Sequence, residues 1–179
     1  SGNNNRCADY GALGITTDGA FAQYMRVPAP AIAQGNIIPL TPGLDAAAAA
    51  LIEPFACVLR GQDSLRVGPG AVVLVIGAGP IGVMHVLLAR LRGAGRVIVS
   101  DVAPERLPAA ERAGADRVID PTREDLGALV LEESQGRGAD AVIVAAPSGA
   151  AMSEAPGLAA IGGRISYFCL LYTSPSPRD

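Results

Sequence analysis

Three glycines and one aspartate between Val72 and Asp101 have the types and spacing to hold a diphosphate and a sugar. The stretch reads VVLVIGAGPIGVMHVLLARLRGAGRVIVSD. We expect Gly77 to turn a strand tightly into a helix, and Gly79, which lacks a Cβ, to let the backbone approach a diphosphate. Gly82 would allow that helix to pack closely on the sheet.

Pro80 and Ile81 open the helix that follows. Pro80 suits a helix start, where its missing N–H costs nothing. The free N–H groups and partial positive charge of the first turn favour an anion. Asp101 lies about 20 residues beyond the turn, where a carboxylate can receive the ribose hydroxyls of a dinucleotide. Because this carboxylate would repel the 2′-phosphate of NADP, the sequence predicts NAD.

Two other interpretations of this stretch stay open. A glycine-rich turn in an α/β sheet can bind nothing, and residues 68–89 carry no charge, so a hydropathy scan would flag them as a membrane span. Residues 77–80 interrupt that span with helix breakers, and the Val/Ile run before them is typical of a strand. The order strand, glycine turn, helix, strand, acid favours a dinucleotide.

The elements that would position these residues alternate along the rest of the chain. This alternation predicts an α/β fold with a doubly wound parallel (Rossmann) sheet, truncated after Phe168. Ala145, Ala146 and Ser148 would end a strand at the carboxyl edge, where small residues let a cofactor lie close, although ordinary packing would also explain them. The predicted strands are 71–76, 96–100, 117–119, 141–145 and 163–168, and the predicted helices are 81–92, 104–113, 124–135 and 150–160.

The residues before this sheet are predicted to be loops, a short β run at 20–28 after a turn at 17–19, and an alanine-rich helix from Asp45. Pro54 should break or kink that helix near Glu53, which would free the Glu53 side chain to point into a cleft. A solvated helix-end glutamate is the alternative. His85, the one histidine, is predicted to be a packed helix residue, and Cys57 a small core residue.

Composition excludes several partners. The net charge is −3 and only 17% of residues are charged, without basic blocks, so nucleic acid and membranes are poor partners. Three scattered cysteines make no disulfide framework and no targeting segment is visible, which favours the cytoplasm. Residues 169–179 read CLLYTSPSPRD, which matches a translated sequencing adapter, so we set them apart from the fold.

Several blocks together resemble the zinc-containing medium-chain alcohol dehydrogenases, in the branch of polyol (sorbitol) and threonine dehydrogenases. The blocks are GNNNRCADYGALGITTDGAFAQYMRVP, IEPFACVLRG, GAGPIG with Asp101 and Arg106, ADAVIVAAPS and LAAIGGRISYF. The resemblance implies the C-terminal part of a β-rich, GroES-like catalytic domain and a linking helix over residues 1–60. It implies an incomplete NAD-binding Rossmann domain over residues 61–168.

The resemblance also implies roles for single residues. Cys7 would be one thiolate of a structural zinc, although a lone cysteine is otherwise inert. Glu53 would lie beside a catalytic zinc, as a ligand or through bound water or substrate. Arg106 would contact the adenosine side of NAD, although it could equally be a solvated helix arginine.

The implied activity is zinc-dependent hydride transfer from a polyol, sugar alcohol or other secondary alcohol to NAD. The implied assembly is a homodimer or homotetramer, with the present piece inactive alone. A zinc-free NAD(P)-dependent quinone or enoyl reductase is one alternative, which Asp101 and Cys7 argue against. A non-catalytic NAD-binding module is another.

Overall fold

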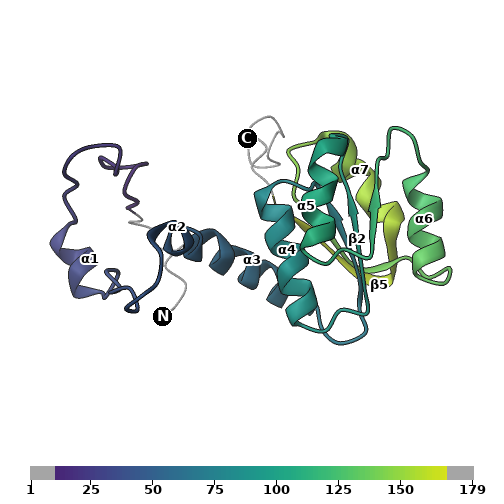
Figure 1. The fold of residues 1–179 in the computed structure, drawn as a ribbon, viewed down its shortest axis with the longest axis horizontal. Coiled ribbons are helices and arrows are strands. Elements are labelled where there is room, and N and C mark those ends of the chain that lie inside the picture. Colours follow the sequence, from purple (N-terminus) through teal and green to yellow (C-terminus); the bar gives the residue numbers. More distant parts are fainter. Residues whose placement is uncertain (1–10, 169–179) are drawn as a thin grey trace. The chain divides into compact units, whose positions relative to one another are not determined.

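The computed structural model describes residues 11–168, which divide into one unit up to Ala49 and a second from Ala50 onward. The described part of the first unit holds two short helices, α1 (Ala29–Ala33) and α2 (Ala46–Ala49) (Figure 1). The β run predicted at 20–28 is wrong, because these residues form no strand and Phe21 and Tyr24 are exposed. A strand needs a hydrogen-bonded neighbour, and the described part of this unit has only an isolated bridge between Leu13 and Thr17.

The second unit begins with α3 (Ile52–Leu65). The predicted helix break is confirmed, although it lies at residues 50–51, just before α3 begins. Pro54 occupies the first turn of α3, where a missing N–H breaks no helical hydrogen bond. The buried side of α3 packs through Val58 against Met84 and Leu88 of α4. The predicted domain boundary at residue 60 falls within α3.

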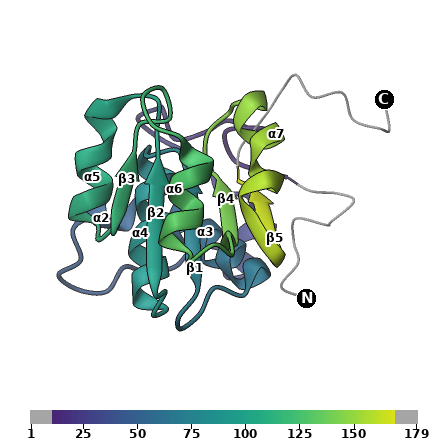
Figure 2. The same cartoon turned by 90° about the vertical axis from the view of Figure 1, so that its right-hand side faces the viewer.

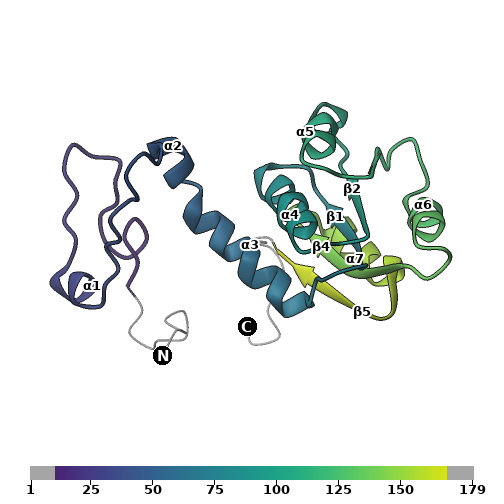
Figure 3. The same cartoon turned by 60° about the horizontal axis from the view of Figure 1, so that its bottom comes forward.

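The predicted doubly wound parallel sheet is confirmed. Its five strands run parallel in the order β3-β2-β1-β4-β5 (Figure 2). Their bounds are β1 (Val72–Ile76), β2 (Arg96–Ser100), β3 (Arg117–Ile119), β4 (Ala139–Val144) and β5 (Ala159–Tyr167). Helices α4 (Pro80–Leu91) and α5 (Leu107–Arg112) cover one face, and α6 (Leu126–Glu133) and α7 (Gly149–Leu158) cover the other (Figure 3).

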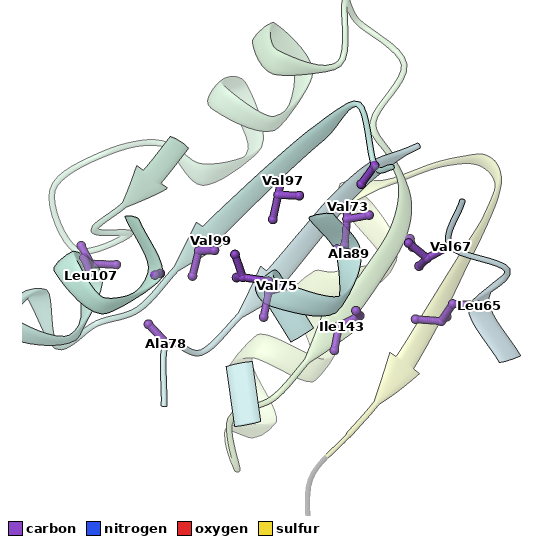
Figure 4. Close-up of a cluster of buried hydrophobic side chains, with 14 residues drawn as sticks. Leu65, Val67, Val73, Val75, Ala78, Ala89, Val97, Val99, Leu107 and Ile143 are labelled. Atoms are coloured by element: carbon purple, nitrogen blue, oxygen red, sulfur yellow. The ribbon is translucent and has the colours of Figure 1, made fainter. Parts of the chain in front are cut away.

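Two apolar layers hold this arrangement together. On one face, Val73, Val75, Val97 and Val99 pack against α4 and α5 (Figure 4). The alternate residues of the same strands pack against α6 and α7 on the other face. All five residues of β1 are therefore buried, as expected for a parallel strand covered on both sides.

Gly82 brings the first turn of α4 against the end of β1. A Cβ built at Gly82 would lie 1.8 Å from the carbonyl oxygen of Gly77 and 3.5 Å from Cγ1 of Val75. No side chain fits at that distance. The close packing of α4 on the sheet therefore requires glycine at position 82, as predicted.

His85 is a packed helix residue, as predicted. It is fully buried on α4, its ring meets Phe168 edge-on with centroids 4.7 Å apart, and its Nδ1 lies 3.3 Å from Nε2 of Gln62. That amide also donates to the His85 carbonyl oxygen at 2.7 Å. Burial lowers the pKa of His85 from its ordinary value to about 4.

The lowered pKa of His85 should make the fold acid-sensitive. Between pH 6.5 and pH 4 the unfolded chain binds a proton that the folded chain refuses, so stability is present above this window and is lost as the pH falls through it. We expect His85 to lower the free energy of unfolding by about 2 kcal/mol between pH 7 and pH 5. Denaturant unfolding of wild type and His85→Gln at both pH values measures this. Equal pH dependence in the two proteins would contradict it.

The Gly82 contact predicts a specific loss of stability. Gly82→Ala should lower the free energy of unfolding by about 1–3 kcal/mol, because the new methyl group would overlap the Gly77 carbonyl. Gly157→Ala in α7 is the matched control, because no atom lies within 4 Å of a Cβ there. The control should be neutral or more stable by up to about 1 kcal/mol. Equal effects of the two changes in urea unfolding would refute the assignment.

Candidate functional site

A cavity of about 440 Å³ lies at the carboxyl ends of the parallel strands. Open α/β sheets bind their ligands at this edge. The residues lining the cavity come from the segments that follow β1, β2, β3 and β4. They are Ile76, Gly77, Gly79, Ser100, Asp101, Val102, Arg106, Pro121, Thr122, Leu126, Ala145, Ala146, Pro147, Ser148, Ala150, Ala151 and Glu154.

The glycine turn forms one wall of this cavity. Gly77 has a φ of 109°, which favours glycine, and a Cβ there would come within 3.0 Å of the Ala145 backbone. Gly79 caps α4, and no atom lies within 4 Å of where its Cβ would stand. The space in front of the Gly79 backbone is therefore open at a helix N-terminus, where an anion is favoured.

Pro80 and Ile81 do not line the cavity. Pro80 occupies the first position of α4, as predicted. Ile81 packs toward the cluster that joins α3 to α4. Pro80 and Ile81 would therefore affect binding only indirectly, through the conformation of the α4 N-terminus.

Asp101 is held firmly beside this glycine turn. Its side chain is almost fully buried, and its Oδ2 accepts the Ala78 N–H at 2.7 Å. Its Oδ1 accepts the Ala103 N–H at 2.8 Å, and Nη1 of Arg106 lies 3.7 Å from Oδ2. Each carboxylate oxygen keeps a further lone pair for a ligand hydroxyl.

The cavity residues fit the dinucleotide that the sequence predicts. The cradle at Gly79 is open, and the buried Ser100 hydroxyl, which lines the cavity, has no hydrogen-bond partner in the described chain. Ala145 and Ala146 line the cavity with small side chains. Sequence reasoning missed Ser100, Thr122 and Glu154. Position at or just after the carboxyl end of a strand was a usable signal for Ser100 and Thr122, but not for Glu154, which lies in the second turn of α7.

Glu53 lies away from this cavity, in the first turn of α3. It is exposed, and its Oε1 accepts a hydrogen bond from Sγ of Cys57 at 3.3 Å. The prediction of Cys57 as a core residue is wrong, because the buried face of α3 is made by Val58, Gln62 and Leu65 and leaves Cys57 exposed. The Glu53 carboxylate raises the pKa of the Cys57 thiol above its ordinary value, with burial adding to the effect.

A zinc site cannot be assembled from the described residues alone. Residues 11–168 contain no group of three or more His, Cys, Asp or Glu side chains placed to hold a metal ion. Glu53 and Cys57 together would supply two ligands, whereas zinc in proteins takes three or four. Cys7 lies outside the described residues.

No helix within residues 11–168 has the length and apolar character to cross a membrane. The interpretation of residues 68–89 as a membrane span is therefore wrong. This segment contains β1 and most of α4, separated by the glycine turn.

Comparison with known proteins confirms the resemblance. The model of the zinc-binding dehydrogenase family matches residues 80–177. L-galactonate-5-dehydrogenase of Escherichia coli K12 is 35% identical over 167 residues, which are 93% of this chain and 47% of the relative. Sorbitol dehydrogenase of Bacillus subtilis 168 is 32% identical over 166 residues, 92% of this chain and 46% of the relative.

Solved structures of similar proteins agree with the fold. A zinc-binding dehydrogenase of Sinorhizobium meliloti 1021 bound to NADP has a TM-score of 0.84 at 32% identity, covering 96% of this chain and 49% of its own. A structure described as a short chain alcohol dehydrogenase from Escherichia coli CFT073, complexed with NADH, has a TM-score of 0.78 at 33% identity, covering 90% of this chain and 46% of its own.

The chain spans about half the length of the curated relatives it matches. The family match runs to residue 177, through most of the segment interpreted as a sequencing adapter, so that interpretation stays a prediction. The match covers more than half of this chain, and the parallel sheet and glycine turn agree with it. The chain belongs to the zinc-binding dehydrogenase family.

Proposed function

We propose that the chain binds NAD in the cavity at the carboxyl edge of its sheet. The observation that carries this proposal is the open space before Gly79 at the start of α4, with the Asp101 carboxylate fixed beside the same turn. The diphosphate would lie against the first amides of α4, and Asp101 would accept the adenosine ribose hydroxyls. Arg106 would approach the adenosine from the same side as Asp101. Ala145 and Ala146 would leave room for the dinucleotide to pass along the sheet edge.

We further propose that the whole protein oxidises a polyol, sugar alcohol or other secondary alcohol. Relatives named L-galactonate-5-dehydrogenase, L-threonine 3-dehydrogenase and sorbitol dehydrogenase support this substrate class. Bound NAD would accept the hydride. The described residues would contribute by fixing the adenosine half of the cofactor, which aligns its nicotinamide. A cytoplasmic homodimer or homotetramer acting on a small-molecule alcohol completes the proposal.

Zinc belongs to this proposal through the family. Glu53 and Cys7 are the proposed residues of the catalytic and structural sites, with the other ligands outside residues 11–168. The side chains of residues 11–168 do not complete a zinc site by themselves. The relatives are dehydrogenases and give no support to a quinone or enoyl reductase.

Cofactor choice must come from this chain's own residues, because similar structures hold NADP in one case and NADH in the other. Asp101 is the residue on which our choice of NAD rests. Its carboxylate would bond to free ribose hydroxyls and repel a 2′-phosphate.

Asp101→Asn tests this choice. The amide oxygen can still accept the Ala78 N–H, so the glycine turn should persist, while the charge and the bond from the Ala103 N–H are lost. We expect NAD affinity to fall about tenfold and the preference for NAD over NADP to fall by at least that factor. Isothermal titration with both dinucleotides measures it, with Asp63→Asn on the exposed side of α3 as the charge control. Tighter binding of NADP than NAD by the wild type would overturn the choice.

Gly79→Val tests whether the open space at Gly79 serves ligand binding and not the packing of the fold. Because no protein atom lies within 4 Å of the new Cβ and the φ of Gly79 is −69°, the free energy of unfolding should change by less than about 1 kcal/mol. NAD binding should weaken at least about tenfold, because the side chain would occupy the proposed diphosphate position. Adenosine, which has no diphosphate, should bind variant and wild type alike. Unchanged NAD affinity in a folded variant would contradict the proposed position.

A further inference from the structure

Glu154 is an acidic side chain on the cavity wall that the proposed contacts of diphosphate and ribose leave unused. It lies in the second turn of α7, and residues three and four positions apart share a helix face. Ala150, Ala151 and Glu154 therefore form one face, and all three line the cavity. The core-facing side of the same helix is made by Ala155 and Leu158. The two alanines keep the space beside Glu154 open.

The charges around the cavity leave Glu154 without a protein partner. Arg106 is the one cation among the lining residues, and its guanidinium lies 3.7 Å from Asp101. The Thr122 hydroxyl, from the segment after β3, donates to Oδ1 of Asp120 at 2.6 Å. Within residues 11–168, Glu154 takes part in no hydrogen bond or ion pair. A carboxylate in this position attracts a ligand group that presents N–H donors.

We propose that Glu154 recognises the 6-amino group of the adenine ring. This inference rests on the proposed function, which sets the diphosphate at Gly79 and the ribose at Asp101. The base is attached to that ribose, so it lies in the same cavity, and its exocyclic amine is the only N–H donor on its ring. The Glu154 carboxylate accepts one of those hydrogens and thereby discriminates adenine from purines with a 6-oxo group.

Nicotinamide hypoxanthine dinucleotide is the probe that tests this assignment. It differs from NAD at the purine, where a carbonyl oxygen replaces the 6-amino group. The wild-type protein should bind NAD about tenfold more tightly than the probe, because the carboxylate would face a carbonyl oxygen at position 6, and the probe's one ring N–H donor lies at N1 instead. Glu154→Gln should reduce this ratio to about twofold or less, since an amide can donate to the carbonyl. Isothermal titration of both dinucleotides against both proteins gives the four affinities.

The matched control is Glu132→Gln. Glu132 is an exposed glutamate of α6 that does not line the cavity, so its change removes the same charge without touching the ligand. The control should keep the wild-type ratio. If Glu154→Gln keeps the wild-type ratio of NAD affinity to probe affinity, the assignment is overturned. A variant that changes the affinity for NADP but leaves this ratio unchanged overturns it too. If NAD does not bind at all, the proposed function fails together with this inference, whereas equal affinities of both dinucleotides for the wild type refute this inference alone.

Discussion

The approach of α4 to the end of β1 is the contact on which the rest of the site depends. Gly82 sits so close to the Gly77 carbonyl that no side chain fits between them. This contact brings the N-terminus of α4 to the carboxyl edge of the sheet, where its N-cap residue Gly79 lines the cavity. It also leaves Gly79 with open space in front of its backbone. Helix, turn and strand therefore form one rigid cradle, supported by two buried apolar layers.

Three charged side chains line the cavity beside this turn: Asp101, Arg106 and Glu154. Asp101 is tied to the turn through the Ala78 N–H, so its carboxylate and the start of α4 keep a fixed spacing. The Arg106 guanidinium lies 3.7 Å from the Asp101 carboxylate. Glu154, on α7, lines the same cavity and has no hydrogen-bond or ion-pair partner among the described residues. The N-cap of α4 and two carboxylates thus line one cavity. Family membership alone does not choose between NAD and NADP, so these few charges must do so.

Much of the second unit follows from local sequence. The predicted strands 96–100 and 117–119 match β2 and β3, because short β-branched runs covered on both faces leave a clear pattern. The glycine turn was readable because Gly77 and Gly82 each answer a steric demand of the fold, whereas Gly79 leaves open space in front of its backbone. The prediction for Cys57 was wrong because the burial of a helix residue changes from one position to the next: Val58 is buried, whereas Cys57 beside it is exposed. Glu154 was missed because only the folding of α7 over the sheet brings it into the same cavity as Asp101. Residues 20–28 form no strand because the described part of the first unit offers them no partner strand.

A crystal structure of the protein soaked with NAD tests the central claim most directly. We expect the diphosphate within hydrogen-bond distance of the first amides of α4 and the adenosine ribose hydroxyls on the Asp101 carboxylate. Density for the dinucleotide elsewhere, or a cavity left empty at saturating NAD, would contradict the account.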